Sequence, residues 1–133
     1  GNEQQASVHP VLVVDDHQIN RLVAIKQLES LGLSAQEAHS ASRAWELVIA
    51  NRYHAILLDV SMPGMDGLEF TRRLRAREES TATTRTTPAL RVIAMTGHAD
   101  GEARRRCIDA GMDDLITKPV DRQALANALR ALD

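Results

Sequence analysis

The stretch AILLDVSMPGMDG, residues 55–67, decides the fold of this chain. Four apolar residues lead directly into Asp59, and a Pro-Gly turn follows before a helix start at Asp66-Gly67. A short, continuous apolar run bounded by turn signals is typical of a strand buried on both faces of a parallel sheet. Such a strand would place Asp59 at the carboxyl edge of the sheet, where ligands bind. On this stretch alone two interpretations stay open: Asp59 is a functional group at that edge, or it merely begins a turn.

Four more strands are predicted outward from this one, at 11–14, 33–38, 90–95 and 115–117, of which 33–38 is the weakest. Helical spacing of apolar residues fills the segments between them, and a further helix opens at Asp121. Alternation of strands with helices predicts an α/β fold with a parallel sheet, right-handed crossovers and helices on both faces.

Local patterns give finer expectations. In the first helix Ile19, Leu22, Val23 and Leu28 recur at near-helical spacing, up to a stop at Gly32. In the second, Ser40 or Ser42 caps a helix that places Trp45 in or beside the core. Residues 77–88 are polar and rich in threonine, which predicts a surface loop.

Length and composition limit the classes of function that are possible. The 133 residues suit one domain, with residues 1–8 as a linker or expression remnant and 9–133 as the domain itself. A net charge of −2 gives no footprint for nucleic acid, and the arginines at 72–77 and 104–106 are interpreted as solvated helix faces. The single cysteine, Cys107, excludes an internal disulfide and is expected to be a small core residue. No apolar run is long enough to span a bilayer, so no membrane contact by this domain itself is expected. The expected location is cytoplasmic, either as a free protein or as the cytoplasmic part of a membrane-bound sensor kinase.

Polar groups end four of the five predicted strands. Asp15 and Asp16 follow the first, Asp59 the third and Thr96 the fourth, while the fifth runs into Lys118. Because the strands are parallel, these ends share one edge. Two carboxylates about 4 Å apart repel by about 4 kcal/mol at an effective dielectric of 20, so the cluster needs a cation. A hard divalent ion with oxygen ligands, Mg²⁺ or Mn²⁺, is the natural choice.

A metal, a lysine and a hydroxyl around one carboxylate form a phosphoryl-transfer site. The metal and lysine would neutralise charge on the moving phosphoryl group, and the carboxylate would be the nucleophile, giving an acyl phosphate. Each residue alone is a weak signal, but the ordered set at successive strand ends is specific.

The motifs VLVVDD at 11–16, LLDVSMPGMDG at 57–67, MTG at 95–97 and KP at 118–119 resemble the receiver domain of two-component response regulators. The resemblance covers the chain from about residue 10 to residue 132. It implies a flavodoxin-like (CheY-like) (βα)5 three-layer sandwich, with a parallel five-stranded sheet of order 2-1-3-4-5.

The same resemblance implies roles for individual residues. Asp59 would be the phosphoacceptor, and Thr96 and Lys118 would bind the phosphoryl oxygens. Asp16 would ligate Mg²⁺ directly and Asp15 mainly through a water, with the main-chain carbonyl of Ser61 as a further ligand. These metal ligands, together with Asp59, make up the expected magnesium site.

The pattern DDHQINR at 15–21, and GMDDLITKP at 111–119, looks like receivers fused to hybrid, or unorthodox, sensor kinases. Such a receiver takes its phosphoryl group from a kinase phosphohistidine and passes it to a histidine phosphotransfer domain. By itself it is a phosphoacceptor with weak self-dephosphorylation. A stand-alone regulator that signals by protein contact stays open as the alternative.

Other classes fit the residues less well. A haloacid-dehalogenase-type phosphatase carries a second Asp two residues after its nucleophile, where this chain has Ser61. A nucleotide-binding module would need a glycine-rich phosphate loop, which does not occur. A pseudo-receiver would not need the acidic set, Thr96 and Lys118.

Two residues depart from the family pattern. Leu115 stands where the family commonly has Tyr or Phe, and Gly97 replaces the commoner Ala after the threonine. Among the five histidines, His17 and His98 are expected near the edge of the site, where either could tune the lifetime of the phosphate.

Overall fold

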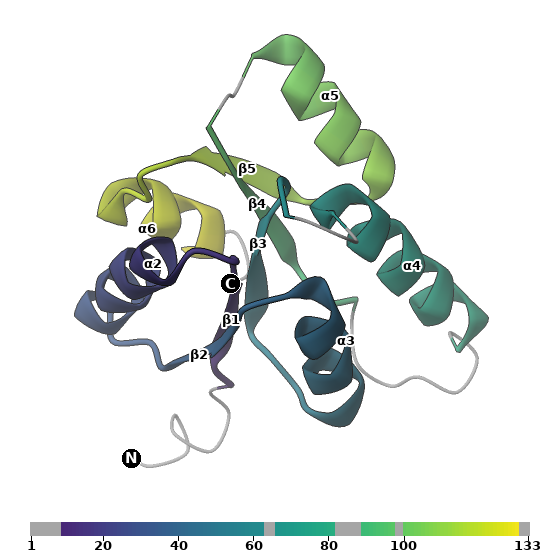
Figure 1. Ribbon diagram of the computed structural model, residues 1–133, viewed down its shortest axis with the longest axis horizontal. Coiled ribbons are helices and arrows are strands. Elements are labelled where there is room, and N and C mark those ends of the chain that lie inside the picture. Colours follow the sequence, from purple (N-terminus) through teal and green to yellow (C-terminus); the bar gives the residue numbers. More distant parts are fainter. Residues whose placement is uncertain (1–8, 63–65, 82–88, 98–99, 131–133) are drawn as a thin grey trace.

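Five parallel strands form one sheet in the order β2-β1-β3-β4-β5 (Figure 1). The computed structural model describes residues 9–62, 66–81, 89–97 and 100–130. The strands are β1 (Val11–Val14), β2 (Ala35–Ala38), β3 (Ala55–Asp59), β4 (Val92–Thr96) and β5 (Asp114–Thr117). The helices are α2 (Gln18–Ser30), α3 (Ala41–Ala50), α4 (Gly67–Ser80), α5 (Gly101–Ala110) and α6 (Arg122–Arg130). The predicted α/β class, strand order and helix alternation are confirmed.

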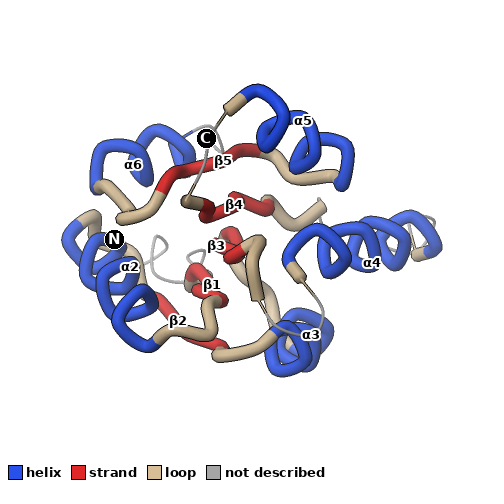
Figure 2. Tube along the Cα trace, turned by 45° about the horizontal axis from the view of Figure 1, so that its top comes forward, coloured by secondary structure: helices blue, strands red, loops and turns tan. Residues whose placement is uncertain are grey.

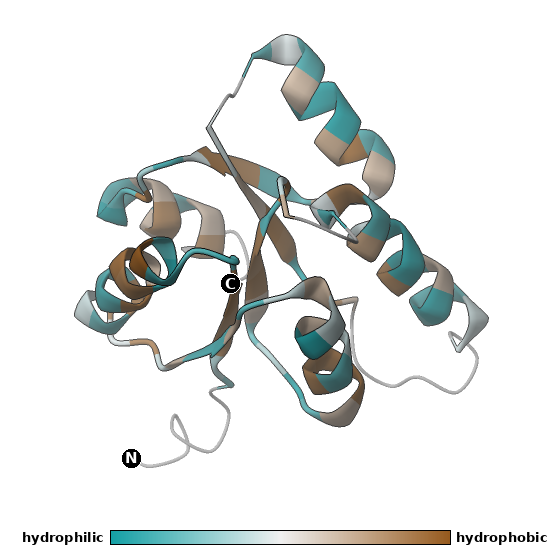
Figure 3. Cartoon of the chain, in the orientation of Figure 1, coloured by the Kyte–Doolittle hydropathy of each residue, from teal (hydrophilic) through white to brown (hydrophobic). Residues whose placement is uncertain are grey.

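Helices cover both faces of the sheet (Figure 2), so each central strand is apolar on both sides. Alternate residues of β3 show this division. Ile56 and Leu58 pack in the layer beneath α3, α4 and α5, whereas Ala55 and Leu57 pack in the layer beneath α2 and α6. Hydropathy along the ribbon agrees with this division, with brown prevailing in the central strands and teal mixed with brown along the helices (Figure 3).

Capping residues begin the helices where the sequence predicts. The Ser40 hydroxyl accepts a hydrogen bond from the main-chain N–H of Arg43, and the Asp66 carboxylate accepts one from that of Glu69. Gly111 ends α5 in the left-handed region, with φ of 105°, as a helix stop requires.

Two core expectations are confirmed. Trp45 is partly buried and meets the Phe70 ring edge-on, with 5.6 Å between ring centroids. Cys107 is buried in the layer beneath α5, and burial raises the pKa of its thiol, which suits an inert core residue.

The first helix differs from its predicted pattern. Ala24 and Leu28 are its buried residues, whereas Ile19 and Leu22 are 68% and 47% exposed. Apolar spacing alone therefore chose the wrong side of the helix for two of the four residues.

Several boundaries also differ, among them the start of β2 at Ala35 rather than at residue 33 and the start of β5 at Asp114 rather than at residue 115. β4 begins at Val92 rather than at residue 90, and α4 continues to Ser80 rather than giving way to a loop at Arg77. The i,i+3 pair between Arg75 and Glu78 supports that last turn. The rest of the expected threonine-rich loop, the Pro-Gly turn and residues 1–8 lie outside the described residues.

Arg75 corrects the interpretation of the arginine run as a solvated face. Its guanidinium donates to the carbonyls of Gly111 and Leu90, at 2.8 and 2.7 Å, and to the Asp113 carboxylate at 2.9 Å. One side chain thus joins α4 to the segment entering β4 and to the turn between α5 and β5.

Gly67 lies against the end of the central strand. A Cβ at this position would stand 2.7 Å from the main-chain oxygen of Asp59 and 2.9 Å from the Cα of Val60. Both atoms belong to the backbone and cannot rotate away. The glycine therefore allows α4 to start directly against the end of β3, where Asp59 lies.

We expect Arg75→Ala to lower the free energy of unfolding by about 2 kcal/mol, because it leaves partly buried acceptors without their donor. Arg73→Ala is the matched control, since Arg73 is exposed and pairs only with Glu69 among the described contacts, and it should cost less than about 0.5 kcal/mol. Urea denaturation measures both, and equal losses would contradict the assignment.

Gly67→Ala should cost about 1–3 kcal/mol of stability, as expected for a side chain forced against fixed atoms. Gly101 is also the first residue of a helix, but a Cβ there would meet nothing within 4 Å. Gly101→Ala should therefore be neutral or stabilise by up to about 1 kcal/mol. If thermal unfolding showed no loss of stability in Gly67→Ala, the main chain at Asp59 and Val60 would have moved aside to admit the added methyl group.

Candidate functional site

Strand register brings the predicted site residues to one edge of the sheet. Val14 of β1 pairs with Leu58 of β3, so the residues that follow, Asp15 and Asp59, lie side by side. Asp59 in turn pairs with Met95 of β4, which puts Thr96 one residue beyond it. In the same way Thr96 pairs with Thr117 of β5, and Lys118 comes next.

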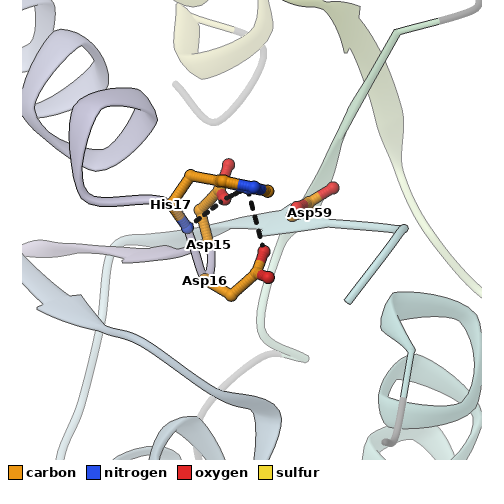
Figure 4. Close-up of side chains that lie close together, drawn as sticks. All are labelled: Asp15, Asp16, His17 and Asp59. Atoms are coloured by element: carbon orange, nitrogen blue, oxygen red, sulfur yellow. Dashed lines mark hydrogen bonds and ion pairs between the residues drawn. The ribbon is translucent and has the colours of Figure 1, made fainter. Parts of the chain in front are cut away.

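The close-up in Figure 4 shows the acidic cluster, in which Asp15, Asp16 and Asp59 gather with His17. One potential ligand atom from each of these four residues lies within 4.8 Å of the other three. Asp15 and Asp59 are 0% and 1% exposed, and Asp16 is partly exposed. The site is therefore a buried floor of two carboxylates with Asp16 and His17 at its rim.

Lys118 supplies the positive charge in the cluster. Its Nζ lies 3.0 Å from Asp59 Oδ1 and 3.5 Å from Asp15 Oδ2. The main-chain N–H of Lys118 donates to the Thr96 carbonyl at 2.8 Å, which fixes the lysine beside β4. Thr96 is itself nearly buried.

Hydrogen bonds satisfy only part of the cluster. The N–H of His17 donates to Asp15 Oδ1 at 2.9 Å, and the N–H of Ser61 donates to Asp59 Oδ1 at 3.0 Å. Within the described structure, Asp15 Oδ2, Asp16 Oδ1 and Asp59 Oδ2 are buried atoms without a hydrogen-bond partner. Unsatisfied buried carboxylate oxygens are costly, and a divalent cation satisfies them, so the donor set fits a hard metal ion.

Burial raises the pKa of the Asp59 carboxyl above its ordinary value. The Ser61 N–H and the Lys118 ammonium oppose the rise, and the Asp15 carboxylate adds to it. The charged form of Asp59 is thus held in surroundings that favour the neutral form, which makes this carboxylate the natural partner for an added positive charge.

An open hollow of about 420 Å³ lies beside the cluster. It is lined by Asp16, His17, Lys118 and the first residues of α2. The hollow gives an incoming group access to the rim, while the floor stays closed by the strands.

All six predicted site residues come together, although their chemical roles stay predictions. His17 lies at the rim as expected, whereas His98 lies outside the described residues. Sequence reasoning missed the structural role of Arg21, whose guanidinium donates to the Asp15 carbonyl at 2.8 Å and to Glu37 at 2.6 Å. The sequence signal for this contact was the Asn-Arg pair that follows the two aspartates. That pair was used only to assign the domain to the hybrid-kinase type.

The model of the response regulator receiver domain matches residues 11–130. This chain belongs to the response regulator receiver domain family. The receiver domain is 37% identical over 119 residues to sensor histidine kinase RcsC of Salmonella typhi, covering 90% of this chain and 12% of that protein. It is 35% identical over 123 residues to hybrid signal transduction histidine kinase L of Dictyostelium discoideum, covering 90% and 7%.

A solved relative has the same architecture. The receiver domain of a sensor histidine kinase from Pseudomonas aeruginosa PAO1 is 31% identical, with a TM-score of 0.78 over 95% of this chain and 98% of that one. That structure holds a magnesium ion coordinated in its active-site cleft. The chain spans only a small part of its curated relatives, and it matches their receiver portion.

No helix among the described residues has the length and apolar character needed to cross a bilayer.

The raised pKa of Asp59 gives a stability prediction. Because the folded pKa lies above the unfolded one, the folded receiver binds this proton more tightly, and stability falls as pH rises between the two values. Above that interval the penalty is fully present. We therefore expect Asp59→Asn to raise the free energy of unfolding at about pH 7 in excess chelator, and to gain less at about pH 4.

Urea denaturation at both pH values measures this difference. Asp109→Asn is the control, since Asp109 is exposed on α5 and should leave stability nearly unchanged. A loss of stability in Asp59→Asn at neutral pH would mean that the Lys118 contact outweighs the burial penalty.

Proposed function

We propose that this receiver domain accepts a phosphoryl group on Asp59 from a phosphohistidine of a partner kinase. The observation that carries the proposal is Asp59 Oδ2, a buried carboxylate oxygen without a hydrogen-bond partner, on a side chain whose other oxygen, Oδ1, lies 3.0 Å from the Lys118 ammonium. Because this oxygen accepts no hydrogen bond, its lone pairs are available for attack on phosphorus.

The transfer balances as a simple displacement. Asp59 Oδ2 forms a bond to phosphorus while the bond from phosphorus to the histidine nitrogen of the donor breaks. The departing imidazole keeps that electron pair and takes a proton from solvent. The product is an acyl phosphate on Asp59 and a neutral histidine on the donor.

Lys118 and Thr96 have separate tasks in this proposal. The Lys118 ammonium, already 3.0 Å from Asp59, pairs with a phosphoryl oxygen as negative charge builds up there. The Thr96 hydroxyl, one residue beyond the β4 partner of Asp59, donates to another.

The cation of the proposed site is Mg²⁺. Asp16, Asp59 and the main-chain carbonyl of Ser61 would hold it directly, and Asp15 mainly through a water. When bound, it would offset the charge of the carboxylates and of the incoming phosphoryl group. The unsatisfied oxygens of all three aspartates support this assignment.

We infer further that the receiver works in a phosphorelay. Its curated relatives are sensor and hybrid kinases, and the DDHQINR and GMDDLITKP segments point the same way. A histidine phosphotransfer domain would then take the phosphoryl group from Asp59. The cytoplasmic location expected from the sequence stays a prediction.

Asp59→Asn should abolish labelling by acetyl phosphate or by a phosphorylated kinase domain, because an amide is not a nucleophile for phosphorus. Asp109→Asn should label as the wild type does. Excess chelator should also stop labelling of the wild type. Undiminished incorporation of ³²P into Asp59→Asn would move the phosphosite to another residue.

Lys118→Ala should slow phosphoryl transfer roughly 100-fold, the usual cost of losing one charge-stabilising donor, while Mg²⁺ affinity stays intact. Lys26→Ala is the control, since Lys26 is exposed on α2 and is the only other lysine in the chain. Transfer rates and calorimetric Mg²⁺ titration separate the two effects. Loss of metal affinity in Lys118→Ala would refute the role given to the lysine.

A further inference from the structure

His17 has an imidazole nitrogen inside the acidic cluster. Its Nδ1 lies 3.2 Å from Asp16 Oδ1 and 3.4 Å from Asp15 Oδ1, and dashed lines in Figure 4 join it to both carboxylates. His17 is also the N-cap of α2, where a side chain commonly binds the first main-chain N–H groups. Its imidazole makes no such capping bond.

The imidazole lies within ion-pair distance of both carboxylates but forms no hydrogen bond with either. Asp16 Oδ1 has no hydrogen-bond partner in the described structure, although His17 Nδ1 is its neighbour. Asp15 Oδ1 already accepts the main-chain N–H of His17. The side chain of His17 is 68% exposed, so packing does not hold it there either.

The spacing suits atoms that share a cation. Metal ions that accept imidazole bind nitrogen and carboxylate oxygen at about 2.0–2.2 Å. Two ligands at right angles are then about 3.0 Å apart, and two at a tetrahedral angle about 3.4 Å apart. The distance of 3.2 Å between His17 Nδ1 and Asp16 Oδ1, where Asp16 is a direct ligand of the proposed site, is of this size.

A second observation points to a bound cation. Asp15 Oδ2 and Asp59 Oδ2 belong to side chains that are almost completely buried, and neither atom has a hydrogen-bond partner in the part of the chain described. In the described cluster the Lys118 ammonium contacts Asp15 and Asp59, and Asp16 is the third carboxylate beside them. The cluster therefore lacks positive charge, and His17 offers it a nitrogen ligand in addition to the oxygens.

We propose that His17 is a side-chain ligand of the cation and makes this site favour first-row transition ions, such as Co²⁺, Ni²⁺ or Zn²⁺, over Mg²⁺. The inference rests on the cation site of the proposed function. Mg²⁺ prefers oxygen ligands and keeps several waters, so an imidazole adds little to its binding. Imidazole suits the later transition ions, which bind mixed nitrogen and oxygen sites more tightly.

Isothermal titration calorimetry of the whole chain with Co²⁺ and with Mg²⁺ tests the proposal. His17→Ala should weaken Co²⁺ binding by at least about tenfold, since loss of even an outer partner of a ligand costs roughly 10- to 100-fold. It should change Mg²⁺ affinity less than about twofold. His17→Gln, which keeps the bulk of the side chain, should behave like His17→Ala.

Two controls place the Co²⁺ ion. His39→Ala removes another exposed imidazole, one that does not belong to the cluster, and should leave both affinities unchanged. Excess Mg²⁺ should displace Co²⁺ from the wild type, because both ions use Asp16 and Asp59. The visible absorption of bound Co²⁺ should shift in His17→Ala, as the nitrogen ligand is replaced by water.

The possible failures are distinct. Unchanged Co²⁺ affinity and absorption in His17→Ala would overturn the role of His17 while leaving the proposed phosphoacceptor site intact. Equal losses for Co²⁺ and Mg²⁺ would also overturn it, since His17 would then only shape the loop. Failure of the wild type to bind either ion would overturn both this inference and the metal part of the proposed function.

Discussion

The register between β1 and β3 is the constraint on which the site depends. Val14 opposite Leu58 puts two aspartates next to each other at the point where both strands end. Apolar side chains on both faces of these strands hold that register, because a shift of one residue would turn every side chain to the opposite face. The hydrophobic core thus forces together charges that would separate in water.

The folded environment disfavours the ionised form of the Asp59 carboxylate that it places at the site. Desolvation of Asp59 and the nearby Asp15 charge both work against the ionised carboxylate, and Lys118 and the Ser61 N–H offset only part of the cost. Gly67 shows the same compromise in the backbone, since the helix beneath the site begins where no side chain fits. In the proposed function, an incoming cation and phosphoryl group would complete the cluster at the place where the fold gives up local stability.

Sequence was sufficient for features that repeat along the chain. Apolar runs that end in Asp, Thr or Lys identify the strands and their common edge, so the fold and the site residues could be predicted together. The contacts that a long side chain makes with residues distant in sequence could not be predicted in this way. Arg75 contacts Leu90 and Gly111, which are distant in sequence, and periodicity records only that it lies on a helix. The exposure of Ile19 and Leu22 was not predicted for a related reason. Apolar spacing defines a face of the helix, but it does not say which face packs on the sheet.

Leu115 is the position at which the departure from the family pattern acquires a physical meaning. Its side chain is 8% exposed and packs in the core beneath α3, α4 and α5, so an aliphatic group fills the place of the common Tyr or Phe. No ring stands there to move between a buried and an exposed state when Asp59 changes its charge. A domain that only hands on a phosphoryl group needs the chemistry of the strand ends, but it does not need a side chain in β5 that reports that chemistry to a distant surface. The buried Leu115 therefore agrees with the proposed relay and gives no support to signalling through a ring in β5 that changes position.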